Sequence, residues 1–85
     1  MMQNDEIKAL ITTGIPGCHV EVAGDDGTHF EAIIVSDSFT GLNMVQQHQL
    51  VYKALGDKMG REIHALSIQT YTPDAWEMKK QLRVI

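Results

Sequence analysis

Four histidines and one cysteine are the side chains of this sequence best suited to binding a transition metal near neutral pH. Cys18 is the only cysteine, so the chain forms no internal disulfide and has no Cys-x-x-Cys motif for a closed zinc or cluster cage. A metal held here would need further ligands from another chain or from small molecules. His64 is the leading candidate, because it opens an apolar strand that runs directly into a helix start.

His64 and His29 each have an ordinary alternative reading. Alternation in an extended chain places His64 on the same side as Leu66 and Ile68, at the rim of a buried face, where a histidine is more often a packed residue than a ligand. His29 precedes Phe30 beside a Gly/Asp-rich turn and faces the opposite way from it. Ligand and solvated turn residue are both open for His29.

The remaining metal-binding types favour structural roles. Cys18 shares a side with Val20 and Val22, which favours a buried thiol. His19 alternates outward and is interpreted as a surface residue, and His48 falls within an apolar helical stripe, which favours packing.

Six elements are predicted to position these side chains, in the order helix, strand, strand, helix, strand, helix. They are a helix at 3–13 capped by Asn4 or Asp5, strands at 18–24 and 28–36 joined by a turn at 24–27, a helix at 42–59 ended by Gly60, a strand from residue 61 to about 70, and a helix started by Thr72 and Pro73. Met44, Val45, Leu50, Val51, Ala54 and Leu55 form the predicted apolar stripe of the second helix.

The element order predicts one α+β domain over 1–85, with a core at about 5–80 and a mobile tail at 81–85. The first two strands should form an antiparallel hairpin, and the apolar run 32–35 suggests that the second strand is central. Helices packed on one face of a three-stranded sheet bury these patterns most simply.

Composition limits the function classes. The net charge of −4 argues against non-specific nucleic-acid binding but does not exclude a local basic patch. No apolar run is long enough for a membrane span and no signal-peptide pattern is present, so we expect a cytoplasmic protein without a membrane partner. No serine lies in a nucleophile-elbow motif and the acidic residues near the turn read as a solvated hairpin end, so we do not expect an enzyme.

Four motifs in this order resemble the BolA family, and most of all its short-loop bacterial class. They are THF at 28–30, VSDSFTGL at 35–42, VQQHQLVY at 45–52, and IHALSI at 63–68 followed by TPDAW at 72–76. The resemblance covers about residues 5–80 and implies an α/β fold related to the class II KH domain.

The resemblance also implies a function. BolA-like proteins pair with monothiol, CGFS-type glutaredoxins and share a [2Fe–2S] cluster, with glutathione and a cysteine supplied by the partner. His64 matches the family's histidine ligand, whereas the second ligand often comes from a longer loop that is short here, which leaves His29 as the nearest candidate. We therefore expect a non-enzymatic adaptor in iron–sulfur cluster trafficking or in iron and stress regulation, a monomer or weak homodimer when alone.

A DNA-binding regulator is the alternative that the KH-like fold suggests. The segment 56–60 resembles the GXXG loop with which KH domains clamp the backbone, but it is one residue longer and contains an acid. A basic patch of Lys53, Lys58 and Arg61 with Lys79, Lys80 and Arg83 is the predicted surface for this alternative.

Overall fold

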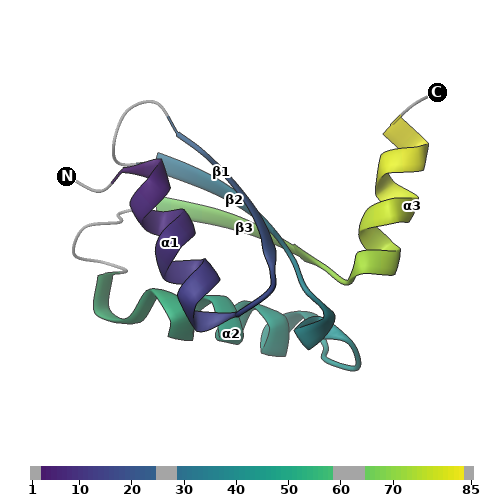
Figure 1. The fold of residues 1–85 in the computed structure, drawn as a ribbon, viewed down its shortest axis with the longest axis horizontal. Coiled ribbons are helices and arrows are strands. Elements are labelled where there is room, and N and C mark those ends of the chain that lie inside the picture. Colours follow the sequence, from purple (N-terminus) through teal and green to yellow (C-terminus); the bar gives the residue numbers. More distant parts are fainter. Residues whose placement is uncertain (1–2, 25–28, 59–64, 84–85) are drawn as a thin grey trace.

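The computed structural model describes residues 3–24, 29–58 and 65–83, and it contains the six predicted elements in the predicted order (Figure 1). The predicted turn at 24–27 and the predicted strand start at 61–64 lie wholly or mostly outside the described residues. The elements are α1 (Asn4–Gly14), β1 (His19–Ala23), β2 (His29–Val35), the short 3₁₀ turn η1 (Asp37–Phe39), α2 (Met44–Leu55), the 3₁₀ turn η2 (Gly56–Lys58), β3 (Ala65–Tyr71) and α3 (Pro73–Arg83).

The sheet has the strand order β1-β2-β3, which confirms β2 as the central strand. β1 and β2 pair antiparallel, as the hairpin prediction required, with His19 opposite Val35 and Ala23 opposite Glu31. β2 and β3 pair parallel, with His29 opposite Ala65 and Val35 opposite Tyr71. The mixed three-stranded sheet of the predicted α+β class is therefore confirmed.

One face of the sheet forms the main core, because alternate side chains of each strand point into it. Val20, Phe30 and Ile34 are buried there, and Leu66 and Ile68 are partly buried against the same cluster. α1 and α2 cover this face (Figure 1), and they contribute buried side chains at the helical spacings of three and four residues. The helical part of the core consists of Ile7, Ile11, Val51 and Leu55.

The second helix is shorter than predicted. It ends at Leu55, because Gly56 takes a φ of +62° that breaks the helical geometry, so the prediction that Gly60 ends the helix was wrong. The predicted stripe was also too wide at its start: Met44 is 56% exposed and Val45 is 65% exposed. The apolar period continues through these residues, but each of them is more than half exposed.

The helix starts follow local hydrogen-bond chemistry. The N-cap of α1 is Gln3, and not Asn4 or Asp5 as predicted: the backbone N–H of Gln3 donates to Glu6 Oε1 at 3.1 Å. At α3 the predicted cap is confirmed, because the Ala75 N–H donates to Thr72 Oγ1 at 3.3 Å. Within the described ranges, none of the helices combines the length and apolarity that a bilayer crossing requires.

The third helix departs from the predicted placement of all helices on one face. Trp76 of α3 packs beside Tyr71, at 5.3 Å between ring centroids, and beside His19, at 6.4 Å. Both residues belong to the sheet face opposite α1 and α2, since His19 alternates with Val20 and Tyr71 with Thr70. α3 thus covers one end of the outer face, and it includes residues 81–83, which we had assigned to a tail.

Candidate functional site

The candidate site lies at the end of the sheet where β2 and β3 begin. Because these strands are parallel, their first residues are neighbours, and His29 is the register partner of Ala65. His29 is exposed and Phe30 is buried, as the alternation predicted. His64 itself falls outside the described residues. It directly precedes Ala65 in the sequence.

A hollow of about 640 Å³ opens at this end of the sheet. Polar residues contribute much of its lining, including His29, Glu31 and Ser67. The full lining consists of Asn4, Val22, Ala23, Gly24, His29, Phe30, Glu31, Ala65 and Ser67.

The start of α1 is tied to the same place. The Asn4 side-chain amide donates to the Gly24 carbonyl oxygen at 3.2 Å, which holds the end of β1 against the helix. This contact joins α1 to the end of the β1–β2 hairpin.

The hollow can supply imidazole and carboxylate donors but not a complete metal cage. Among the residues that the structure describes, no group of three His, Cys, Asp or Glu side chains is arranged to hold a metal ion. His29 can be one nitrogen ligand, and neutral imidazole is a suitable ligand for iron. A cluster bound here would need donors from a second molecule, as the single cysteine of the chain had already indicated.

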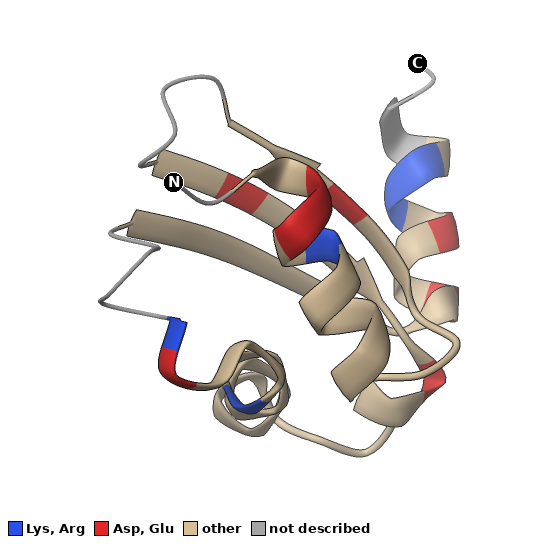
Figure 2. Cartoon of the chain, turned by 60° about the vertical axis from the view of Figure 1, so that its left-hand side comes forward, with Lys and Arg blue, Asp and Glu red and all other residues tan. Residues whose placement is uncertain are grey.

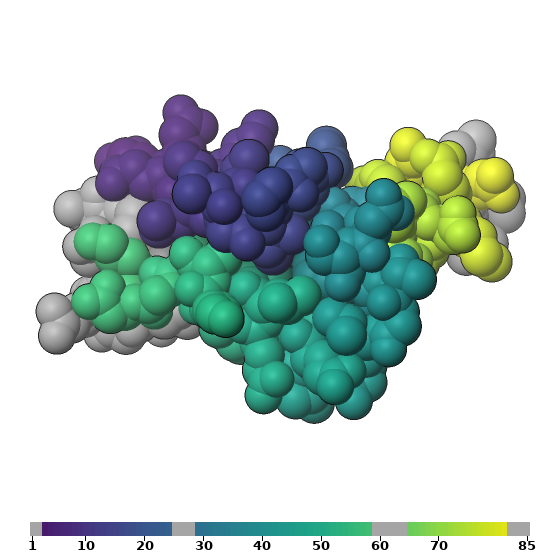
Figure 3. All heavy atoms as spheres, turned by 60° about the horizontal axis from the view of Figure 1, so that its bottom comes forward, coloured from purple at the N-terminus to yellow at the C-terminus, as the bar shows by residue number. Residues whose placement is uncertain are grey.

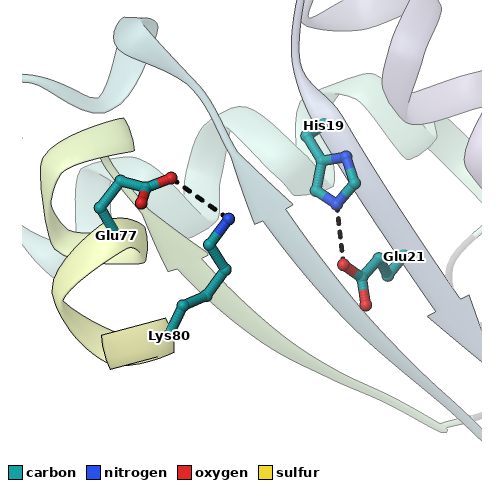
Figure 4. A network of polar contacts seen from close by, with 4 residues as sticks. All are labelled: His19, Glu21, Glu77 and Lys80. Carbon is teal, nitrogen blue, oxygen red and sulfur yellow. Dashed lines mark hydrogen bonds and ion pairs between the residues drawn. The ribbon is translucent and has the colours of Figure 1, made fainter. Parts of the chain in front are cut away.

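The three other candidates lie elsewhere. Cys18 is half-buried against the core, with its Sγ 4.0 Å from the Ile11 carbonyl oxygen, and desolvation by burial raises the pKa of its thiol. His19 lies at the opposite end of the sheet, where its Nε2 is 2.8 Å from Glu21 Oε2 (Figure 4). His48 is half-buried on α2, in keeping with the predicted packing position.

The four predicted lysines that the structure describes do not form one surface. Lys53 and Lys58 line an open groove of about 630 Å³ between α1 and α2, the two helices that lie side by side in Figure 3. Lys79 and Lys80 belong to α3, at the other end of the molecule from the last turn of α2 (Figures 1 and 2). Arg61 is outside the described residues, and nothing is described of the Arg83 side chain.

The two lysines of α3 have local contacts of their own. Lys79 Nζ lies 5.7 Å from the centroid of the Tyr71 ring, and Lys80 Nζ lies 3.2 Å from Glu77 Oε1 (Figure 4). Because both lysines already contact side chains of this protein, α3 presents less unpaired positive charge to a polyanion such as DNA.

Three residues of the hollow were not singled out from the sequence as site residues. The sequence pattern favours a solvated hairpin end for Glu31 and a helix cap for Asn4, and it contains no motif that points to Ser67 as a site residue. The signal for Glu31 and Ser67 was the two-residue period, because they follow His29 and Ala65 on the same side of their strands. For Asn4 no local signal exists, since its contact spans 20 residues.

Comparison with known proteins gives one consistent relationship. The family model for BolA-like proteins matches residues 16–75. The chain is 37% identical over 82 residues to the acid stress protein IbaG of Escherichia coli, covering 95% of this chain and 96% of that protein. It is 43% identical over 54 residues, 64% of this chain and 51% of the relative, to the DNA-binding transcriptional regulator BolA of Vibrio cholerae.

A solved structure agrees with these sequence matches. The fold superposes on a BolA protein homologue from Coxiella burnetii with a TM-score of 0.81 and 45% identity, over 91% of this chain and 99% of that one. The combination of motifs, fold and coverage gives the same answer as the sequence resemblance. The chain belongs to the BolA family.

Proposed function

We propose that this chain is a non-enzymatic adaptor that binds a monothiol glutaredoxin and shares a [2Fe–2S] cluster with it. Its role would be in iron–sulfur cluster trafficking or in iron and stress regulation. Membership of the BolA family supports the partner, because the family resemblance implies a CGFS-type glutaredoxin. The Escherichia coli relative is named as an acid stress protein, which supports a stress-related setting.

The observation that carries this proposal is the β2–β3 register. It makes the exposed His29 the neighbour of Ala65, and Ala65 is the residue that directly follows His64 in the sequence. The polar hollow beside this pair leaves room for a ligand that a second protein brings in. His29 and Ala65, the residue that follows His64 in the sequence, thus lie at one end of the sheet.

We assign the two histidines unequal roles. His64 is the principal ligand, because it matches the histidine that the family resemblance identifies. Strand alternation in the sequence assigns His64 and His29 to opposite sides of the sheet. His29 is therefore a secondary ligand, because it could share a cluster with His64 only if the cluster lies past the ends of the strands. Cluster binding would supply a redox-active iron centre whose potential is raised by histidine ligation, and whose histidine bonds weaken when acid protonates the imidazole.

Reconstitution with a CGFS glutaredoxin, glutathione, iron and sulfide tests the proposal. The visible circular dichroism of the cluster-bound heterocomplex is compared for wild type, His64→Ala and His29→Ala. His19→Ala is the matched control, because His19 is also an exposed strand residue but lies at the other end of the sheet. Titration of the same complexes from pH 8 to pH 5 then tests for acid-labile histidine ligation, since an unperturbed imidazole titrates near pH 6.5.

We expect His64→Ala to abolish or reshape the spectrum, His29→Ala to weaken it and His19→Ala to leave it unchanged. If the heterocomplex and its spectrum are unchanged in His64→Ala, His64 is not a cluster ligand. If the wild type does not bind the glutaredoxin, with or without cluster, the proposed partner is wrong.

DNA binding is the second candidate, and the name of the Vibrio cholerae relative favours it together with the lysines beside the α1–α2 groove. Lys53 and Lys58 are the described residues that would contact phosphates, with Arg61 next in the sequence. Gel shifts on duplex DNA over a salt series test this, with Lys53→Ala as the variant and Lys80→Ala as the control on α3. Affinity that is negligible at low salt, or equally reduced by both variants, would exclude this surface.

A further inference from the structure

The groove between α1 and α2 has the size of a small-molecule site. Its volume of about 630 Å³ lies within the range of ligand clefts in proteins. Each helix contributes one face, because the lining residues recur at helical spacings of three and four. None of the described lining residues also lines the hollow at His29, so a ligand in the groove would leave the candidate metal site accessible.

The apolar part of the lining is aliphatic. Leu10, Leu50 and Ala54 pack against the core and remain only partly buried, and all three line the groove. The two helices touch at one place along it, since a Cβ added to Gly14 would lie 2.4 Å from Ala54 Cβ. An alkyl chain in the groove would therefore be covered by side chains of both helices.

The charged part of the lining is mainly positive, although the whole chain carries a net charge of −4. Lys53 is exposed, and among the contacts of the described residues its ammonium has no carboxylate partner. Lys58 also lines the groove. Glu6 is the acidic residue of the described lining, and its Oε1 already accepts from the Gln3 N–H at 3.1 Å to cap α1. An anionic group is therefore complementary to the groove beside Lys53.

We propose that this groove binds a single-chain aliphatic carboxylate, with its alkyl chain against Leu10 and Leu50 and its carboxylate at Lys53. The Lys53 ammonium donates a hydrogen bond to the carboxylate. The alkyl chain removes the exposed parts of the two leucines from water, and each buried methylene raises the affinity about fourfold.

The combination of an aliphatic surface with a lysine selects this ligand over other anions. The described lining contains no aromatic side chain on which a nucleobase could stack, and no arginine for bidentate binding of a phosphate. A DNA backbone at Lys53 would leave Leu10 and Leu50 uncovered, because phosphates bring no apolar surface. The proposal is independent of glutaredoxin and cluster binding, since it uses neither His29 nor His64.

An NMR titration of the full chain with decanoate, below its micelle concentration, tests the proposal. We expect saturable binding with a dissociation constant of about 1 mM, as the size of decanoate implies. Amide shifts should cluster at Leu10, Gly14, Leu50 and Ala54, with nuclear Overhauser effects from the chain methylenes to the two leucines. Decyltrimethylammonium, which has the same chain and a positive head, should bind at least about fivefold more weakly. Acetate, which has the head alone, should cause no saturable shifts.

Two variants with matched controls test the residues. Lys53→Glu should weaken decanoate binding about tenfold, whereas Lys8→Glu should have little effect. Lys8 is the control because it is also exposed, lies on α1 outside the lining, and changes the net charge equally. Ala9→Phe should fill the groove and weaken binding at least about fivefold, whereas Ala75→Phe, on an exposed position of α3, should not. Thermal unfolding checks that all four variants remain folded.

Several results would overturn the proposal. One is the absence of saturable shifts at about 10 mM decanoate. Others are equal affinity for decanoate and decyltrimethylammonium, equal effects of Lys53→Glu and Lys8→Glu, or unchanged affinity in a folded Ala9→Phe variant. Binding to phosphatidylglycerol vesicles without binding of free decanoate would indicate a membrane surface in place of a ligand site.

Discussion

A close contact between the first two helices offers a sharp test of how the core is packed. Gly14 ends α1 against α2, and a Cβ added there would lie 2.4 Å from Ala54 Cβ and 2.8 Å from Ala54 Cα. Neither atom can rotate away, since one is backbone and the other is attached to it directly. Gly14→Ala therefore forces the two helices apart.

The expected cost follows from two opposing terms. Overpacking a well-filled contact costs about 1–3 kcal/mol. Replacing glycine by alanine in a helix returns up to about 1 kcal/mol, and less at a last residue. We expect a net loss of about 1–2 kcal/mol in the free energy of unfolding. For a chain of this length that corresponds to a melting temperature lower by roughly 5–15 °C.

Urea unfolding followed by far-UV circular dichroism measures this loss, and a double-mutant cycle identifies its cause. Ala54→Gly alone should cost about 1 kcal/mol, because it places glycine inside a helix. In the double variant the 2.4 Å clash is gone but the 2.8 Å contact remains, so the losses should fall short of additivity by at least about 0.5 kcal/mol. A Gly14→Ala variant as stable as wild type, or strictly additive losses, would refute this account of the contact.

Three further predictions follow from the described contacts. Thr70→Val should lower the free energy of unfolding by about 1–3 kcal/mol, because Gln47 Oε1 loses its buried donor; an unchanged melting temperature would contradict this. Thr72→Ala should cost about 1 kcal/mol by removing the α3 cap, and Thr72→Asn should restore most of it in the same melting assay. Burial raises the pKa of the Cys18 thiol above its ordinary value, so the folded thiol should alkylate more slowly than the unfolded one at the same mildly alkaline pH. The stability that its neutral form contributes is present below the ordinary pKa of a thiol and is lost as the pH rises through the raised pKa, and Cys18→Ala should remove that loss; equal alkylation rates would contradict the burial.

Local sequence patterns were sufficient to predict most of the fold. Period-two alternation predicted which side chains of β1 and β2 are buried, because one face of a sheet must meet a core. The Thr72 cap was predicted since its donor and acceptor lie three residues apart. Trp76 shows the limit of this reasoning. Its own helix does not reveal which face of the sheet it will cover, and its partner His19 is distant in the sequence.

Of the candidate site, the sequence predicted the strand-start position of His29 and not the arrangement around it. His29 could be recognised at a strand start from the pattern around Phe30. Its pairing with Ala65 depends on a parallel register between strands that 36 residues separate (65 − 29), which no local signal specifies. The separation of the described lysines could not be predicted for the same reason: the sequence positions of Lys53 and Lys79 do not specify how far apart α2 and α3 lie.

The position of Trp76 decides what an optical experiment on this protein reports. It is the sole tryptophan of the chain, and it lies against Tyr71 at one end of the outer sheet face, apart from the cluster that α1 and α2 bury. Its emission therefore follows the attachment of α3, whereas far-UV ellipticity follows all three helices. If α3 detaches before the rest unfolds, the two signals give separate transitions, and a fluorescence melt alone would describe the docking of one helix as the stability of the protein.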